Sequence, residues 1–211
     1  MPHPLWQSLA TDAGQPLSDQ QLSQLDKYID LLIHWNEKFN LTRIVDKEDA
    51  QVKHVADALT LLQFLMPAEA PAALTLADVG TGGGVPGVPI AICRPDISVT
   101  LIDSTKKKLD AIQNMTEDIG LKNVKFLHAR AETVKKQFDI VTARAVADLD
   151  TLLQWTWPIF KPTGVLLAMK GPKAQEELRL ASRRLQYMKR SARIEQVKVE
   201  GLEGHCVVRV G

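Results

Sequence analysis

Apolar residues recur at intervals of three and four positions through most of the first 70 residues. This spacing predicts amphipathic helices over residues 5–70, because such residues share one face of a helix. Ser18 followed by Gln21 is the signature of a capping box at a helix start. Asn40-Leu41-Thr42 marks the exit from the first long helix. The apolar stripe of that helix consists of Leu22, Leu25, Ile29, Leu32, Ile33, Trp35 and Phe39.

A second long helix is predicted to start after Asp46, whose carboxylate suits an N-cap position. Pro67 and Pro71 are expected to end this helix. His54 and Asp57 lie three positions apart on it, so their side chains can meet without implying a metal. Its buried face is expected to contain Val52, Val55, Leu59, Leu62 and Leu65.

The pattern changes at residue 74 to strands that alternate with helices. Strands are predicted at 74–79, 99–102, 124–127, 138–142 and 165–169. Helices are predicted at 89–94, 106–119 with Gly120 as C-cap, 149–160 ended by Pro162 and Gly164, and 174–186. Residues 194–199 and 206–210 alternate with period two, which predicts an antiparallel pair at the sheet edge.

This order of elements predicts an α/β fold in which a doubly wound, Rossmann-like sheet carries a helical cap at its amino terminus. Two segments are expected, namely an N-terminal helical extension at 1–72 and a ligand-binding domain at 73–211. Ligands of such sheets bind at the carboxyl ends of the strands, where the strand order reverses.

Composition excludes several classes of protein. The chain has 211 residues and a net charge of +1, which suits one medium-sized domain. Cys93 and Cys206 form no C-x-x-C pair, so neither a zinc site nor another metal site is expected. No signal peptide and no apolar run long enough for a membrane span is evident. We therefore expect a cytoplasmic protein, and nothing in the sequence calls for more than a monomer.

One glycine-rich stretch, Leu76 to Gly87, joins the first predicted strand to the next helix. Glycine suits positions where φ is positive or where the backbone lies close to a ligand. The unpaired N–H groups at the start of the helix that follows the loop suit an anionic group. Gly82-x-Gly84-x-x-Gly87 matches the fingerprint of dinucleotide-binding proteins. Asp78-x-Gly80-x-Gly82-x-Gly84 resembles the first motif of class I methyltransferases, which bind S-adenosylmethionine. The stretch alone leaves both alternatives open.

Asp103 ends the second strand about twenty residues beyond the glycines, the separation at which an acid binds a ribose diol in this fold. Asp103 could instead only cap the helix that follows it. Ala131 and Glu132 follow the third strand, where their backbone groups would face an adenine. Arg144 follows the fourth strand, where it could contact a base or the cofactor.

The region around Arg144 is informative for what it lacks. It contains no Asn-Pro-Pro-Tyr motif for an exocyclic amine and no cysteine nucleophile for attack on a pyrimidine ring. If the chain is a methyltransferase, a ring nitrogen with a free lone pair, such as guanine N7, would suit as the methyl acceptor. Because N7 carries no proton, no general base is required, and the enzyme mainly positions the reacting atoms. No catalytic residue is assigned.

Positive charge is concentrated near the carboxyl terminus. Residues 170–198 contain nine lysines and arginines against three glutamates, whereas the whole chain is nearly neutral. Such asymmetry suits a phosphate backbone, although a basic helix can also be only a solvated surface. Lys170, Arg183 and Arg184 are the candidate RNA-binding residues.

Beyond these features, the chain resembles the bacterial ribosomal RNA small subunit methyltransferase G family, also called glucose-inhibited division protein B. The run from Asp78 to Ala91, with its Pro-Gly-x-Pro continuation, carries this resemblance most specifically. It extends from about residue 20 to the end of the chain. Further matching segments are Trp35-Asn36, Asn40-Leu41-Thr42, His54 with Asp57, Leu101-Ile102-Asp103-Ser104, Ala143-Arg144-Ala145 and Met169-Lys170-Gly171.

The resemblance implies an S-adenosylmethionine-dependent enzyme that methylates N7 of one guanine in small-subunit (16S) ribosomal RNA, either free or in a ribosomal subunit. It implies that Gly80, Gly82 and Val85 contact the cofactor in the loop, that Asp103 holds the ribose, and that Ala131 and Glu132 flank the adenine. Arg144 would complete this site, and Lys170 would lie on the RNA side. The sequence departs from the family pattern at Ala58, where serine is frequent, and in the lysine-rich run 106–108.

Two other interpretations are weighed against this one. A nicotinamide oxidoreductase would need a hydride-transfer residue pair and a substrate domain, and neither is evident in the sequence. The intact glycine stretch and Asp103 argue against the other interpretation, an RNA-binding protein that no longer catalyses a reaction.

Overall fold

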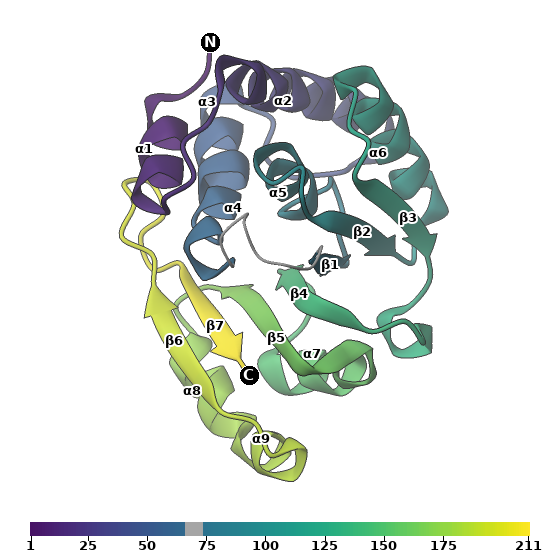
Figure 1. Cartoon of the computed structure of the whole chain (residues 1–211), viewed down its shortest axis with the longest axis vertical. Coiled ribbons are helices and arrows are strands. Elements are labelled where there is room, and N and C mark those ends of the chain that lie inside the picture. The colour runs from purple at the N-terminus through teal and green to yellow at the C-terminus, as the bar shows by residue number, and fades with distance from the viewer. Residues whose placement is uncertain (66–73) are drawn as a thin grey trace.

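The computed structural model describes residues 1–65 and 74–211. Its centre is a seven-stranded sheet in the order β3-β2-β1-β4-β5-β7-β6 (Figure 1). The first five strands of the chain run parallel, and β7 pairs antiparallel with both β5 and β6. The strands are β1 Thr75–Val79, β2 Ser98–Asp103, β3 Val124–His128, β4 Phe138–Arg144, β5 Phe160–Lys170, β6 Ala192–Gln196 and β7 Cys206–Val210. The predicted doubly wound sheet with an antiparallel edge is confirmed.

Helices cover both faces of this sheet. The N-terminal helices are α1 Pro4–Asp12, α2 Asp19–Phe39, α3 Lys47–Ala50, the π-helical turn η1 Gln51–Ala56, α4 Asp57–Leu59 and the 3₁₀ turn η2 Leu62–Phe64. The later helices are α5 Gly87–Cys93, α6 Lys106–Ile119, α7 Leu149–Thr156, α8 Ala174–Leu180 and α9 Ser182–Met188, with 3₁₀ turns η3 Ala131–Thr133 and η4 Trp157–Ile159.

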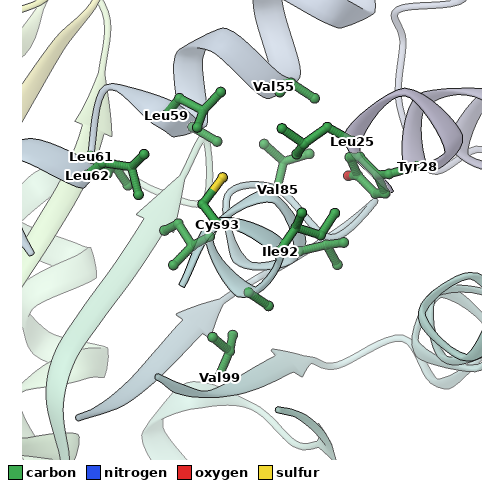
Figure 2. Packing of buried hydrophobic residues seen from close by; sticks show 14 of the residues in the cluster. Leu25, Tyr28, Val55, Leu59, Leu61, Leu62, Val85, Ile92, Cys93 and Val99 are labelled. Atoms are coloured by element: carbon green, nitrogen blue, oxygen red, sulfur yellow. The ribbon is translucent and has the colours of Figure 1, made fainter. Parts of the chain in front are cut away.

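Alternation along the strands divides the core into two layers, because successive side chains of a strand point to opposite faces. Leu76 of β1 packs in one cluster with the N-terminal helices, α5 and α6. Its neighbour Ala77 packs in the other cluster, with α7, α8 and α9. Figure 2 shows Leu25 and Tyr28 of α2 and Leu59 of α4 packed around α5 in the first layer.

The N-terminal extension is part of the first core layer rather than a separate body. Its longest helix, α2, begins at the predicted capping box, in which the Gln21 N–H donates to Ser18 Oγ at 3.3 Å. Ser18 N–H donates in return to Gln21 Oε1 at 3.0 Å. Asp46 caps α3 as expected. The predicted boundary between residues 72 and 73, and the predicted helix-ending Pro67 and Pro71, lie outside the described residues.

Four local predictions differ from the structure. The helix predicted at 149–160 ends at Thr156, and β5 already begins at Phe160, so Pro162 and Gly164 lie inside a strand and do not end a helix. The helix predicted at 174–186 is divided into α8 and α9 at Ala181. The strand predicted at 194–199 lies at 192–196. The helix predicted after Asp46 contains a π-helical turn, a feature that is frequent at functional sites.

Candidate cofactor and acceptor site

The loop between β1 and α5 has a backbone that requires glycine. Gly80 and Gly82 have φ of 65° and 55°, in the left-handed region that other residues adopt rarely. Gly84 also has a positive φ, at 94°. Positive φ at the three glycines of the Asp78-x-Gly-x-Gly-x-Gly stretch fits the methyltransferase-like motif, whose glycines begin directly at the strand end.

Asp78 fixes the shape of this loop from inside. Its carboxylate is fully buried and accepts hydrogen bonds from Thr81 Oγ1 at 2.6 Å, Gly87 N at 3.0 Å and Thr142 Oγ1 at 3.2 Å. Burial raises the pKa of Asp78 to about 6, although these hydrogen bonds and Arg144 act in the opposite direction. The expectation that the amino end of α5 faces an anionic ligand is wrong at Gly87, because the protein's own carboxylate takes that N–H.

A first pocket of about 270 Å³ lies at the ends of β1, β2 and β3. It brings together four predicted cofactor residues, Gly80, Asp103, Ala131 and Glu132. Its remaining lining consists of Val79, Ile102, Ser104, Ala129, Arg130, Val146 and Trp155. We call it the adenosine pocket because an acid at the second strand end and backbone groups at the third suit a ribose and an adenine.

Asp103 is fixed by two backbone N–H groups at the edge of the adenosine pocket. Its Oδ1 accepts from Thr105 N at 2.8 Å, at the start of α6, while Oδ2 accepts from Gly82 N at 3.0 Å. The same side chain lines the adenosine pocket. Since each carboxylate oxygen has two lone pairs, these bonds leave capacity for ribose hydroxyls.

A second pocket, of about 260 Å³, continues from the first along the glycine loop. The two share Gly80 and Asp103, and the second is also lined by Gly82, Val85 and Arg144. The N-terminal extension contributes Leu32, Leu41, Thr42 and His54 to its wall. We call it the loop pocket. Together the adenosine and loop pockets contain all seven residues predicted to bind the cofactor.

A third pocket, of about 460 Å³, shares His54, Arg144 and Ala145 with the loop pocket. It lies beyond Arg144 at the ends of β4 and β5, and we call it the acceptor pocket. Its other lining residues are Ile44, Lys53, Asp57, Ala147, Met169, Lys170, Gly171, Glu177 and His205. The three pockets therefore lie next to one another along the carboxyl edge of the sheet, and we call this row of pockets the trough.

Arg144 separates the loop pocket from the acceptor pocket and is held from the N-terminal extension. Its guanidinium donates to Lys53 O at 2.6 Å and to His54 Nδ1 at 2.9 Å, and lies 3.5 Å from Asp57 Oδ2. Because a guanidinium only donates, His54 Nδ1 must accept. The His54 proton then lies on Nε2, which donates to Thr42 Oγ1 at 2.8 Å. His54 and Asp57 do not hydrogen-bond to each other as their spacing allowed; instead, both side chains face Arg144.

The electrostatics agree with this assignment. Burial, together with the positive charge of Arg144, lowers the pKa of His54 to about 3. His54 is therefore neutral at physiological pH and orients Arg144 as a hydrogen-bond acceptor.

The three predicted RNA-binding residues do not share one environment. Lys170 lines the acceptor pocket, where its Nζ lies 2.8 Å from Glu177 Oε2 and donates to Ala147 O. Arg184 on α9 forms a two-pronged pair with Asp150, at 2.8 Å for each bond. Arg183 is exposed on the same helix. Neither arginine lines the trough.

Several residues that line or support the trough lack any recognisable signal in the sequence. Tyr28 of α2 is buried and donates from its hydroxyl to Gly83 O at 2.9 Å, so α2 holds the glycine loop. Trp155 of α7 lines the adenosine pocket, and His205, just before β7, lines the acceptor pocket.

No trio of histidine, cysteine or acidic side chains among residues 1–65 and 74–211 is arranged to hold a metal. Within the same ranges, no helix is long and apolar enough to cross a membrane.

The sheet order and the trough at its carboxyl edge define a class I methyltransferase fold. Solved structures show the same fold. A magnesium protoporphyrin IX methyltransferase from Synechocystis is 14% identical with a TM-score of 0.63, covering 87% of this chain and 96% of that one. A ribosomal protein L11 methylase from Lactobacillus delbrueckii is 15% identical with a TM-score of 0.57, covering 79% of each chain.

Within this class, the chain belongs to the rRNA small subunit methyltransferase G family, whose sequence model matches residues 21–205. A ribosomal RNA small subunit methyltransferase G from Streptococcus pneumoniae is 42% identical over 178 residues, covering 81% of this chain and 74% of the relative. The Lactococcus lactis protein of the same name is 39% identical over 177 residues, with the same coverage. The resemblance noted in the sequence is confirmed, and the oxidoreductase interpretation is set aside.

Proposed function

We propose that this chain transfers a methyl group from S-adenosylmethionine to N7 of one guanine in small-subunit ribosomal RNA. The observation that carries the proposal is the trough, in which the loop pocket, with its predicted cofactor residues, and the acceptor pocket share Arg144. The names of the family and of the S. pneumoniae relative support the choice of RNA.

The adenosine and loop pockets suit the two ends of the cofactor. In this assignment Asp103 accepts hydrogen bonds from the ribose hydroxyls, while Ala131 and Glu132 flank the adenine. Gly80, Gly82 and Val85 line the path toward the methionine end, where Arg144 completes the wall. When bound, S-adenosylmethionine supplies the methyl group as an electrophile.

The acceptor pocket suits a purine base that has been brought out of the RNA. Guanine N7 has a free lone pair and no proton to lose, so the protein's task is to hold this atom against the methyl donor. No general base is needed, and His54 already uses both of its ring nitrogens in hydrogen bonds. Catalysis in this account rests on positioning by both pockets.

Outside the trough, Arg183 and Arg184 are proposed to contact RNA phosphates, and Lys170 to face the RNA from within the acceptor pocket. We propose that the protein acts as a monomer, because nothing in its sequence calls for a partner chain. The proposed place of action is the cytoplasm, on free RNA or an assembled subunit.

Replacing Asp103 tests the cofactor assignment. Asp103→Ala should weaken S-adenosylhomocysteine binding about tenfold or more, because hydrogen bonds to a charged acceptor contribute about 1.5–3 kcal/mol. Titration calorimetry measures this affinity. Asp110→Ala is the matched control, since it removes a half-exposed carboxylate from nearby α6. Equal affinity in the wild type and Asp103→Ala would show that Asp103 does not hold the ribose.

A further inference from the structure

His205 is a polar residue of the acceptor pocket with no role assigned so far. It lies in the turn before β7, and its side chain is 40% exposed. Its Nδ1 lies 3.2 Å from Asp57 Oδ1. No hydrogen-bond partner of its Nε2 atom is found within residues 1–65 and 74–211. The ring is thus anchored at one nitrogen, and the other remains available to a ligand.

Asp57 determines which nitrogen carries a proton. A carboxylate only accepts, so His205 must donate from Nδ1 in both its neutral and its charged form. Asp57 is itself almost fully buried, with its side chain 3% exposed, and it also faces Arg144. A buried carboxylate in this position favours the imidazolium, in which Nε2 carries a proton as well.

We propose that His205, held by Asp57, is a specificity-determining residue that donates a hydrogen bond from Nε2 to O6 of the target guanine. This inference rests on the proposed function. The N7 edge of guanine presents two acceptors, N7 and O6, and N7 must stay free to receive the methyl group. Adenine carries an amino donor where guanine carries O6, so a fixed donor admits guanine and opposes adenine.

The Asp57–His205 pair also suits the change in charge during the reaction. Methylation at N7 makes the base cationic, so an isolated positive donor would oppose it. Asp57 offsets the charge of the imidazolium, and the pair adds a donor without adding net charge. The other charged groups facing this region are Lys53 from η1, Arg144 from β4, Lys170 from β5, Glu177 from α8 and Glu203 from the turn before β7.

A double-mutant cycle tests this contact by combining substitutions of His205 with the replacement of guanine O6 by sulfur. Small subunits lacking the modification are assembled with guanosine or 6-thioguanosine at the methylated position, since sulfur is the weaker acceptor. Single-turnover methylation is then measured with wild type, His205→Ala and His205→Gln. The thio substitution should lower the single-turnover rate of the wild type about tenfold, because losing one charge-assisted hydrogen bond has an effect of this size. His205→Ala should be slowed as much with guanosine, with little further loss with 6-thioguanosine.

His205→Gln retains an amide donor and should keep part of the rate. Affinity for S-adenosylhomocysteine should stay unchanged in both variants, because His205 does not line the adenosine or loop pockets. Glu200→Gln, at an exposed residue between β6 and β7 that does not line the acceptor pocket, is the control and should retain the wild-type rate and thio effect. If the thio substitution slows the wild type and His205→Ala by the same factor, His205 does not contact O6.

The pH dependence gives a second readout. The hydrogen bond that His205 donates to Asp57 raises the pKa of His205 above its usual 6.5, although burial and Arg144 act against this. Since Nε2 donates only in the imidazolium, the wild-type rate should fall as pH rises through this pKa. The rate of His205→Gln should lack this step. If both proteins show the same profile, a protonated His205 is not the donor and the proposal fails.

Discussion

Asp78 is the residue at which the glycine loop, α5 and β4 meet. Thr81, Gly87 and Thr142 all donate to its carboxylate, so one buried side chain fixes the start of the cofactor site. Burial raises the pKa of Asp78 to about 6 from the usual 3.8. A raised pKa means that the folded state binds this proton more tightly than the unfolded state, so the stabilisation is present at low pH and is lost as pH rises.

Asp78→Asn tests this argument, because an amide resembles the protonated acid but does not titrate. Between about pH 4 and pH 6, the free energy of unfolding of the wild type should fall relative to that of the variant, by on the order of 3 kcal/mol. Urea unfolding at several pH values measures this difference. Asp110→Asn, at a half-exposed carboxylate, should show no such trend. A difference for Asp78→Asn that does not vary with pH would contradict the assigned pKa.

At the scale of elements, α2 supports the cofactor loop from outside the sheet. Tyr28 donates to the Gly83 carbonyl at 2.9 Å, and Leu32 packs so closely that a Cβ on Gly83 would lie 2.8 Å from Leu32 Cδ1. The helical extension therefore determines the shape of the loop pocket. This explains why a segment that precedes the ligand-binding domain in the sequence matters for its site.

Tyr28→Phe removes only this hydroxyl. It should lower the free energy of unfolding by about 1–3 kcal/mol, because the buried Gly83 carbonyl loses its donor. Affinity for S-adenosylhomocysteine should fall as well, since the loop becomes less fixed. Calorimetry and urea unfolding measure the two effects. Tyr187→Phe, at a tyrosine that is 85% exposed, is the control and should change neither.

The sequence predicted the elements wherever the signal was local. The capping box at Ser18, Gly120 as the C-cap of α6 and the antiparallel pairing of β6 with β7 are confirmed, although β7 is buried at four of its five positions and does not alternate. The predicted end of the helix near Pro162 and Gly164 was wrong. Phe160 pairs with Phe138 of β4, and both side chains are buried, so sheet pairing begins before the residues that looked like breakers.

The sequence predicts those site residues that lie at or directly after the end of a strand. Asp103, Ala131 and Glu132 were placed by their positions after β2 and β3, and the structure brings them into one pocket. Their binding to a cofactor stays a prediction. His205 could not be found in this way, because its contact with Asp57 joins residues 148 positions apart. Only the folded arrangement of the terminal hairpin and α4 makes that pair visible.

For the whole molecule, the question is how the trough meets a large RNA. The net charge of +1 gives no general attraction, so local basic groups must supply it. Arg184 is already paired with Asp150, at 30% and 37% exposure of the two side chains, whereas Arg183 is exposed on the same helix. Arg183 is therefore the cleaner probe of this surface.

Arg183→Glu should weaken binding to small-subunit RNA and lower the slope of log affinity against log salt by about 1, if Arg183 contacts a phosphate. Affinity for the cofactor should not change. Lys122→Glu makes the same change of charge at an exposed site before β3 and serves as the control. Binding is measured by filter retention across a range of salt. The same slope for Arg183→Glu and wild type would show that α9 does not face the RNA.

The most direct test of the central claim is to incubate the protein with methyl-labelled S-adenosylmethionine and unmodified small ribosomal subunits. The RNA is then digested and the labelled nucleoside is identified, with free ribosomal RNA as a parallel sample. The account predicts label in 7-methylguanosine at a single position. Label in any other nucleoside, or no label in either sample while the cofactor still binds, would contradict it.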